Sequence, residues 1–593
     1  MLTKQKPIDF DPVRVYGKYK YNMGTTLGEA ATDGRVRGFW TLTLEPATAI
    51  RVKRILGRVR ASRTGEIHVW DSPEVSRDIE WIIDRWELTP MDTASAQTLA
   101  TGAAVHRKRE RAITEILGGQ RRMHLPQAPA KDPRDYQLTA VELLRATGRL
   151  LLTDSVGLGK TFTGLLNAVN EDALPMVVVT PTHLPSRWVQ EVKDSFPWLT
   201  VGVAKKASIP TGWTTEHLPD IFIVPYSRLH GWAGHLDGIA KTVVFDEVQE
   251  LRNGTSTRKG AAAAQLTQNA SYKLGLTATP IYNYGGEVWE ILDIVGPGEL
   301  GSREEFTREW GYGMNNGKVF IQDPAALGGY LREQGLMLGR TRKEVGRELP
   351  PYITVPMVVD SDPTALEKIK GDARRLAQLI LADTTTNHER MEASGELSWK
   401  LRQATGIGKA PFVAEFVRLL LESEKKIVLF GWHRAVYDIW MDALADFGPR
   451  LYTGSESPAQ KDDAAKAFMQ PLDVNGRGCR VLIMSLRSGS GLDGLQDHAK
   501  VAVLGELDWS PQVHHQGIGR LDRDHTDGNE GREPVIAYYL HSEDGSDPVI
   551  LEALGIKRNQ SEPMVNVDGK LTTSAAPDMG RARMLAKNLL GVK

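Results

Sequence analysis

The chain has 593 residues, a formal net charge of −1 at pH 7 and a single cysteine, Cys479. This length exceeds what one hydrophobic core supports, so we expect roughly three or four domains. No apolar run approaches the ~20 residues of a membrane span, and one cysteine excludes a disulfide framework and a Cys-rich zinc site. With so little net charge, any nucleic-acid surface must be a local patch. Because a chain with one cysteine forms no internal disulfide, a reducing, cytoplasmic compartment is expected.

Residues 1–122 are predicted to form a small N-terminal α+β module, with 21 Lys and Arg against 15 Asp and Glu. Its expected strands are 39–44 and 66–70, and its expected helices are 47–56, 76–86 with Ser76 as N-cap, and one through 107–111 that ends near Gly118. Basic residues crowd the first helix and the chain after it: Arg51, Lys53, Arg54, Arg58, Arg60 and Arg63. The cluster indicates either a solvated helix face or a surface that contacts DNA phosphates.

Residues 123–296 begin with a Pro- and Ala-rich linker and a helix at 138–146, followed by LLTDSVGLGKT at Leu151–Thr161. This stretch is typical of a strand, a phosphate-binding loop and a helix from about residue 162 to 170, because loop N–H groups and the positive helix end cradle a polyphosphate. Lys160 is expected to reach the β- and γ-phosphates and Thr161 to ligate Mg²⁺. The other residues expected to bind nucleotide here are Ser155, Val156, Gly157, Leu158 and Gly159.

Two positions near this loop need separate comment. Asp154 stands where the G-x-x-x-x-G-K-[ST] pattern has its first glycine. Gln137 opens the preceding helix, where it could read an adenine edge with its paired donor and acceptor. In isolation, a surface Gln at a helix start is the alternative interpretation.

Strands and helices alternate after the loop, with expected strands at 176–180, 221–224, 242–246 and 272–277. Continuous apolar strands between helices predict a parallel sheet covered on both faces. Ligands gather at the carboxyl ends of such strands. Asp246 and Glu247 lie at one of these ends. Asp246 is expected to hold Mg²⁺, and Glu247 to orient or deprotonate the attacking water.

A second α/β region is expected at 411–555, separated from the first by a helical insertion or linker region, 297–410. A polar tail follows at 556–593, for which disorder is the default expectation and a short basic helix at 580–590 is the alternative. The expected strands of the second region are 426–430, 481–484, 501–504 and 535–538. Arg520 and Arg523 are three residues apart on a probable helix and would share one face. They could stabilise charge on a transferring phosphoryl group; a surface salt-bridge face is the alternative.

Five motifs occur in the order and spacing of superfamily 2 helicase motifs I, II, III, V and VI: Asp154–Thr161, Asp246–Gln249, Leu276–Pro280, Ser488–Asp493 and Gln516–Arg523. The chain resembles the SWI/SNF-type DNA translocases, particularly the annealing-helicase branch, over about residues 130–550. Three joining segments carry that closer likeness: Gly339–Pro351, Ala404–Pro411 and Gly505–Pro511. Gln249 departs from the usual His of the DEAH box, and His525-Thr526 from the Gly-Gln of many relatives.

The resemblance implies two tandem RecA-like lobes, with parallel sheets flanked by helices and with helical insertions, and ATP and Mg²⁺ as cofactors. It implies that lobe one supplies Lys160, Thr161, Asp246 and Glu247, and that lobe two supplies Arg520 and Arg523. It adds Gln516 to the catalytic set and Asp493 to the nucleotide contacts. Residues expected to contact nucleic acid are Thr182, Arg187, Tyr226, Ser485, Arg487 and Ser488, while Thr277 and Thr279 would link both sites.

The expected function is that of an ATP-dependent translocase that remodels duplex or forked DNA through contacts independent of base sequence, during replication or repair. Two alternatives are a strand-separating DNA or RNA helicase and a motor subunit of a larger restriction or transcription-recycling complex. A nucleotide switch is a third, although it has little use for Arg520 and Arg523 together. A bacterial or viral setting fits the absence of a recognisable chromatin-reading motif.

Overall fold

The computed structural model describes residues 15–24, 37–59, 65–121, 123–278, 285–315, 318–346, 352–382, 386–486, 492, 494–523, 533–552, 554 and 578–590. The chain divides into two compact units, one of Met1–Thr153 with Thr161–Leu338 and one of Asp154–Lys160 with Gly339–Lys593. Among the described residues, every helix is too short or too polar to span a bilayer.

The N-terminal part of the first unit is a four-stranded sheet in the order β3-β2-β1-β4. Its elements are β1 (Gly17–Gly24), β2 (Arg37–Leu44), α1 (Pro46–Ile55), β3 (Glu66–Trp70), α2 (Pro73–Trp86), β4 (Leu88–Pro90) and α3 (Thr93–Leu117). The core gathers Trp40, Leu42 and Ile79, all fully buried. The expected strands and helices are confirmed, but the N-cap of α2 is Ser72, whose side chain accepts from Val75 N at 3.1 Å. Ser76 is a buried residue inside the helix.

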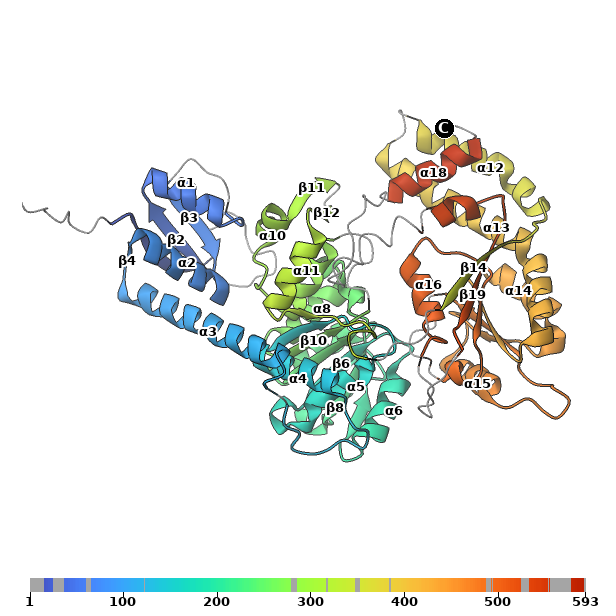
Figure 1. The fold of residues 1–593 in the computed structure, drawn as a ribbon, viewed down its shortest axis with the longest axis horizontal. Coiled ribbons are helices and arrows are strands. Elements are labelled where there is room, and N and C mark those ends of the chain that lie inside the picture. Colours follow the sequence, from blue (N-terminus) through green and yellow to red (C-terminus); the bar gives the residue numbers. More distant parts are fainter. Residues whose placement is uncertain are drawn as a thin grey trace, which may run out of the picture. The chain divides into compact units, whose positions relative to one another are not determined.

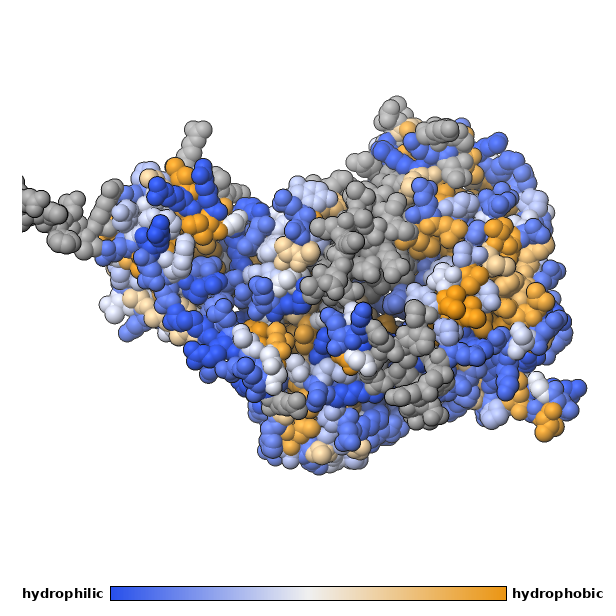
Figure 2. Space-filling model, viewed as in Figure 1, coloured by the Kyte–Doolittle hydropathy of each residue, from blue (hydrophilic) through white to orange (hydrophobic). Residues whose placement is uncertain are grey.

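The long helix α3 leads from this sheet to α4 and the rest of the first unit, and its visible surface is hydrophilic (Figures 1 and 2). The second part of the unit is a seven-stranded sheet in the order β13-β5-β10-β9-β6-β8-β7, with every pair parallel. Its strands are β5 (Arg149–Leu152), β6 (Met176–Thr180), β7 (Val201–Val203), β8 (Ile221–Pro225), β9 (Thr242–Asp246), β10 (Tyr272–Leu276) and β13 (Met337–Leu338).

Every residue of β6 and β8 is buried, so both faces of this sheet are covered, as continuous apolar strands require. The surrounding elements are α4 (Asp135–Thr147), α5 (Lys160–Leu165), α6 (Pro185–Ser195), α7 (Leu229–Leu236), α8 (Arg258–Thr267), α9 (Glu287–Val295), α10 (Arg303–Trp310), the hairpin β11 (Gly311–Asn315) and β12 (Lys318–Ile321), and α11 (Pro324–Glu333). The helix after the glycine loop is shorter than expected, because α5 gives way to a 3₁₀ helix at Leu166–Val169.

The second unit contains a six-stranded parallel sheet in the order β14-β19-β18-β15-β17-β16. Its strands are β14 (Ile353–Val358), β15 (Ile427–Gly431), β16 (Arg450–Tyr452), β17 (Val481–Ser485), β18 (Val501–Leu504) and β19 (Ile536–His541). Its helices include α12 (Thr364–Leu381), α13 (Asn387–Ser423), α14 (Arg434–Ala443), α15 (Pro458–Met469), α16 (Pro511–Ile518) and α18 (Asp578–Leu590) (Figure 1).

Two expected boundaries need correction. The segment 297–410 does not form a region of its own, because β13 joins the first sheet, β14 joins the second, and α13 continues through residue 410. In the polar tail, the default expectation of disorder does not hold for residues 578–590: they form the basic helix α18, which packs against α12 and buries Leu585 and Ala586.

Candidate active site

The glycine loop begins where β5 ends and stops where α5 begins, as the sequence predicts. Gly157 and Gly159 have φ of +88° and +74°, a region that side chains disfavour. The Lys160 ammonium donates to the carbonyl oxygens of Asp154 at 2.5 Å and Ser155 at 3.1 Å. A lysine folded over the loop in this way lies beside the backbone that would cradle a polyphosphate.

The acidic pair lies at the carboxyl end of β9, two strands from β5 in the same sheet. Asp246 Oδ2 accepts from Trp188 Nε1 at 2.8 Å and from the Thr180 hydroxyl at 3.4 Å. Burial, and then the neighbouring charge of Glu247, raises the pKa of Asp246 to about 6. Glu247 has φ +50°, a left-handed backbone that costs a non-glycine residue energy and that is enriched at active sites. Gln249, at the position of the usual His, donates from Nε2 to Glu247 Oε2 at 2.5 Å.

The donor set at this edge of the sheet fits a magnesium ion. Thr161 and Asp246 offer hard oxygen ligands, and a divalent cation would relieve the repulsion between two adjacent carboxylates. The described residues contain no group of three or more His, Cys, Asp or Glu side chains placed to hold a metal. Mg²⁺ commonly uses one or two carboxylates together with substrate phosphates, so a full protein cage is not required.

Other expected contacts in the first unit divide into exposed and buried side chains. Thr182 is exposed and its hydroxyl lies 3.3 Å from that of Ser227, while Arg187 is half-buried on α6. Tyr226 is buried, and its hydroxyl donates to the Asp246 carbonyl oxygen at 3.0 Å. The expected phosphate contact of Tyr226 therefore needs correction, because its side chain lies in the interior and supports the acidic pair. Thr277 is buried and its N–H donates to Leu152 O at 3.1 Å.

In the second unit, Gln516 is half-buried on α16, and this helix ends at Ile518. Arg520 and Arg523 thus follow the helix in a turn, and the expectation of a shared helix face is wrong. Arg520 is buried, which argues against a surface salt-bridge face, and Arg523 Nε donates to Gly519 O at 3.0 Å. Ser485 ends β17. Thr279, Arg487, Ser488 and Asp493 lie outside the described residues.

Gln137 is buried in the first turn of α4, so the interpretation as a surface Gln does not hold. Its Oε1 accepts from Arg134 N at 3.0 Å and caps the helix.

Comparison with known proteins bears on this arrangement. A family model described as the SNF2-related domain matches residues 79–394, more than half of the chain. The chain belongs to the SNF2-related family. The expected resemblance to SWI/SNF-type proteins is thereby confirmed. The sheets confirm the expected α/β class, with two parallel-sheet units and an N-terminal α+β module.

Individual SNF2-related proteins are similar at low identity. The "Uncharacterized ATP-dependent helicase" of Mycoplasma pneumoniae is 26% identical over 66% of this chain and 38% of its own length. The "DNA annealing helicase and endonuclease ZRANB3" of Mus musculus is 24% identical over 64% of this chain and 36% of its own length. The solved "Sulfolobus solfataricus SWI2/SNF2 ATPase core in complex with dsDNA" is 20% identical, with a TM-score of 0.35, over 79% of this chain and 99% of that one. This chain thus spans less than two fifths of the length of the Mycoplasma pneumoniae and Mus musculus relatives.

Two arginines of the SNF2-related chain that the sequence analysis did not identify lie against the glycine loop. Arg340 donates from Nε to Asp154 Oδ1 at 2.9 Å and from Nη2 to Asp154 Oδ2 at 2.7 Å. Within the same unit, Arg342 donates from Nε to Val156 O at 3.0 Å, and its Nη1 lies 3.4 Å from Asp522 Oδ2, next to Arg523. Both belong to the joining segment Gly339–Pro351, whose likeness to relatives was the one available signal.

Glu506, just after β18, is a third buried group that the sequence analysis did not assign. Its Oε2 accepts from Trp432 N at 2.6 Å and His433 N at 2.9 Å, and its Oε1 lies 2.6 Å from His433 Nδ1. These contacts fix the chain that leaves β15 to the chain that leaves β18, at the carboxyl edge of the second sheet.

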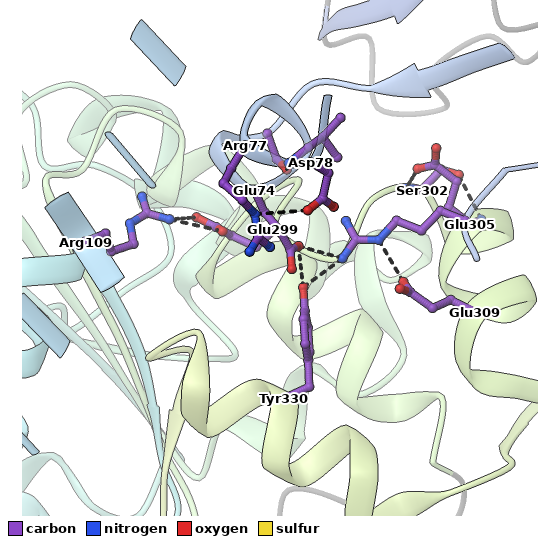
Figure 3. A network of polar contacts seen from close by, with 12 residues as sticks. Glu74, Arg77, Asp78, Arg109, Glu299, Ser302, Glu305, Glu309 and Tyr330 are labelled. Atoms are coloured by element: carbon purple, nitrogen blue, oxygen red, sulfur yellow. Dashed lines mark hydrogen bonds and ion pairs between the residues drawn. The ribbon is translucent and has the colours of Figure 1, made fainter. Parts of the chain in front are cut away.

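The N-terminal basic cluster of this SNF2-related protein is not one surface. Arg58 is buried and pairs with Glu74 of α2 at 2.8 Å and Glu309 of α10 at 2.7 Å, and its Nη2 donates to the Tyr330 hydroxyl of α11 at 2.7 Å (Figure 3). Burial disfavours the charged form of Arg58, but these partners offset it and raise its pKa. Arg58 therefore joins the N-terminal sheet to α10 and α11, and neither interpretation of the basic cluster, a solvated helix face or a surface that contacts DNA phosphates, holds for this residue.

The rest of the cluster is divided between exposed and undescribed positions. Arg51 and Arg54 are exposed, Lys53 is half-buried, and Arg60 and Arg63 lie outside the described residues. A second ionic contact attaches α3, where Arg109 Nη1 lies 3.0 Å from Glu299 (Figure 3). Glu299 also forms an ion pair with Arg149, whose Nε lies 2.8 Å from Oε1. Arg149 begins β5, so this contact connects α3 to the strand that leads to the glycine loop.

Proposed function

We propose that this SNF2-related protein hydrolyses ATP to move along duplex or forked DNA, and remodels it during replication or repair. The observation that carries the proposal is the pairing of a Gly-Lys-Thr loop after β5 with an Asp-Glu pair after β9, at the carboxyl edge of one parallel sheet. Ligands of open α/β sheets gather at such edges. The printed names of relatives, which include an ATP-dependent helicase and a DNA annealing helicase, support the same chemistry.

In the proposed reaction, the chain's own residues bind the triphosphate and activate water. Lys160 would exchange its loop carbonyl partners for β- and γ-phosphate oxygens. Glu247 would orient or deprotonate the attacking water, held in place by Gln249. Thr161 and Asp246 would hold Mg²⁺, which when bound neutralises charge on the phosphate oxygens. Trp188 keeps Asp246 in one orientation.

Arg520 and Arg523 are proposed to stabilise charge on the γ-phosphate, with Gln516 nearby on α16. Support comes from Arg342, which contacts both Val156 of the glycine loop and Asp522, the residue before Arg523. Movement would follow from closure of the two lobes on ATP and their release after hydrolysis.

Nucleic-acid contacts are proposed at exposed or strand-end polar groups: Thr182, Ser227 and Arg187 in the first unit and Ser485 in the second. Hydroxyl and guanidinium donors of this kind bind backbone phosphates and carry no base sequence information. Thr277, which bonds to the end of β5, would link these contacts to the nucleotide. The buried Cys479 fits a reducing compartment, and we propose a cytoplasmic setting.

The proposal is tested by measuring ATP hydrolysis without nucleic acid and with single-stranded DNA, duplex DNA, forked DNA or RNA. We expect the largest stimulation by duplex or forked DNA. Displacement of a third strand from a DNA triplex would then show movement along the duplex without strand separation. Stimulation by RNA alone would refute the DNA translocase, whereas unwinding of a plain duplex would favour a strand-separating helicase.

A further inference from the structure

We infer that Arg340 is a positioning residue for the glycine loop: it holds Asp154, and through it the loop backbone, in the conformation that accepts the ATP phosphates. The inference rests on the proposed function, because it assumes that the loop binds ATP. It concerns a residue outside the Gly-Lys-Thr motif and explains why an aspartate can occupy the first position of that motif.

The first step is the backbone. Parallel pairing of β5 with β13 continues past both strands, since Leu151 N donates to Leu336 O, Thr153 N to Leu338 O and Ser155 N to Arg340 O, at 2.8 to 2.9 Å. The same register is therefore kept from the strand into the glycine loop. The segment that follows β13 is an extended support for the first residues of the loop.

The second step is the charge. The Asp154 side chain is fully buried, and it accepts three N–H groups of Arg340: the backbone N at 3.1 Å, Nε at 2.9 Å and Nη2 at 2.7 Å. A two-point arginine–carboxylate contact fixes both direction and distance. Without Arg340, a buried and uncompensated anion would lie at the start of a loop that must bind a polyanion. The arginine therefore offsets a charge that would otherwise repel the nucleotide.

The third step is the neighbouring arginine. Arg342 donates to Val156 O, and a Cβ at Gly157 would lie 2.5 Å from Arg342 Nη2. Arg340 and Arg342, two residues apart in the segment that follows β13, thus contact the loop at two successive points. Lys160 also holds the loop, by donating to Asp154 O and Ser155 O. These contacts of Arg340 hold Asp154 and Ser155, which is what a positioning role requires.

The experiment compares MgATP binding by calorimetry, and KM and kcat for ATP hydrolysis, in the full chain and three variants. We expect Arg340→Ala to weaken ATP binding and raise KM at least tenfold. Arg340→Lys keeps the charge but loses the two-point contact, so an intermediate value is expected. The double variant Asp154→Gly with Arg340→Ala removes both charges and restores a glycine, and should recover most of the lost affinity.

Arg145→Ala is the matched control, because Arg145 makes a two-point contact with Asp172 at 3.1 and 3.0 Å away from the loop. It should bind ATP within twofold of the unaltered chain. An Arg340→Ala variant that also binds within twofold would overturn the inference. A double variant as weak as Arg340→Ala would overturn it too, because Arg340 would then act on the nucleotide itself. Failure of the unaltered chain to bind ATP would instead refute the proposed function.

Discussion

Two arginines in different regions of the molecule, Arg58 buried and Arg340 half-buried, make similar contacts for different ends. Arg340 donates to a single carboxylate, that of Asp154, and thereby fixes the seven-residue loop Asp154–Lys160, where the phosphates of ATP are expected to bind. Arg58 is shared between Glu74, Glu309 and the Tyr330 hydroxyl, and joins the N-terminal sheet to α10 and α11. The contacts alone do not distinguish a residue that supports the nucleotide site from one that only stabilises the fold. What tells them apart is whether the partner lies on an element that can bind substrate.

The largest expected effect lies at the loop and sharpens this comparison. Lys160→Ala and Glu247→Gln should each lower ATP turnover at least 100-fold, about 2.7 kcal/mol in the barrier. Glu247→Gln should still bind ATP, because it removes only the group that activates water. Both variants should unfold within a few degrees of the unaltered chain. Turnover above a tenth of normal in either would show that this residue is wrongly assigned.

At the N-terminal junction the expected effect is on stability and not on chemistry. Arg58→Ala leaves Glu74 and Glu309 with an uncompensated, largely buried charge, so the free energy of unfolding should fall by about 3 kcal/mol. Chemical denaturation of the first unit measures this loss. Arg51→Ala, which removes an exposed arginine of the neighbouring helix, should cost less than about 0.5 kcal/mol. Equal losses for the two variants would contradict the structural role of Arg58.

A smaller effect concerns Asp78, beside Arg77 at the same junction (Figure 3). Burial raises the pKa of Asp78 to about 6, so the folded chain binds this proton more tightly than the unfolded chain. Stability owed to Asp78 is therefore present at low pH and is lost as the pH rises from about 4 to about 6. Asp78→Asn should remove that dependence of stability on pH. The free energy of unfolding of the variant, relative to that of the unaltered chain, should therefore be higher at pH 8 than at pH 4.

The measurement is the free energy of unfolding of Asp78→Asn and the unaltered chain at pH 4, 6 and 8. About a third of the Asp78 side chain stays exposed, which reduces the amplitude through solvent screening. A difference between the two proteins that does not change with pH would exclude a raised pKa.

The smallest expected effect is on DNA binding by the exposed arginines of α1. Arg51→Gln with Arg54→Gln should weaken binding at low salt and reduce the slope of log affinity against log salt by at most about 2. Arg85→Gln with Arg111→Gln removes the same charge from exposed positions on α2 and α3 and serves as the control. If neither pair of substitutions changes the slope of log affinity against log salt, the exposed arginines of α1 do not contact DNA phosphates.

Much of the fold was predictable because buried parallel strands are continuous apolar runs, and β6, β9 and β18 have the bounds expected from the sequence. The edge strands β13 and β7 were missed because two or three residues carry no pattern. The six-residue edge strand β14 and the eight-residue β1 were not predicted either. The expected boundary at 410 preceded Pro411, a residue that helices rarely contain, yet α13 continues through it. Local sequence could not show that tertiary packing holds this helix together.

The candidate site shows the same division. Lys160, Asp246 and Glu247 were predictable because their motifs are short stretches with a fixed chemical order. Arg340 and Glu506 were not assigned, because each acts through a partner 74 to 186 residues away that only folding brings near. Tyr226 and Arg58 were assigned to a surface from residue type alone, and burial reversed both assignments.

Helix α18 has a practical consequence for anyone who shortens this protein. Its Leu585 and Ala586 help to cover α12, whose inner stripe includes Leu376 and Ile380. Truncating the chain near residue 556, where the sequence turns polar, would expose hydrophobic side chains of α12 to solvent. The truncated protein would then aggregate during purification, and this aggregation could be mistaken for a loss of ATPase activity.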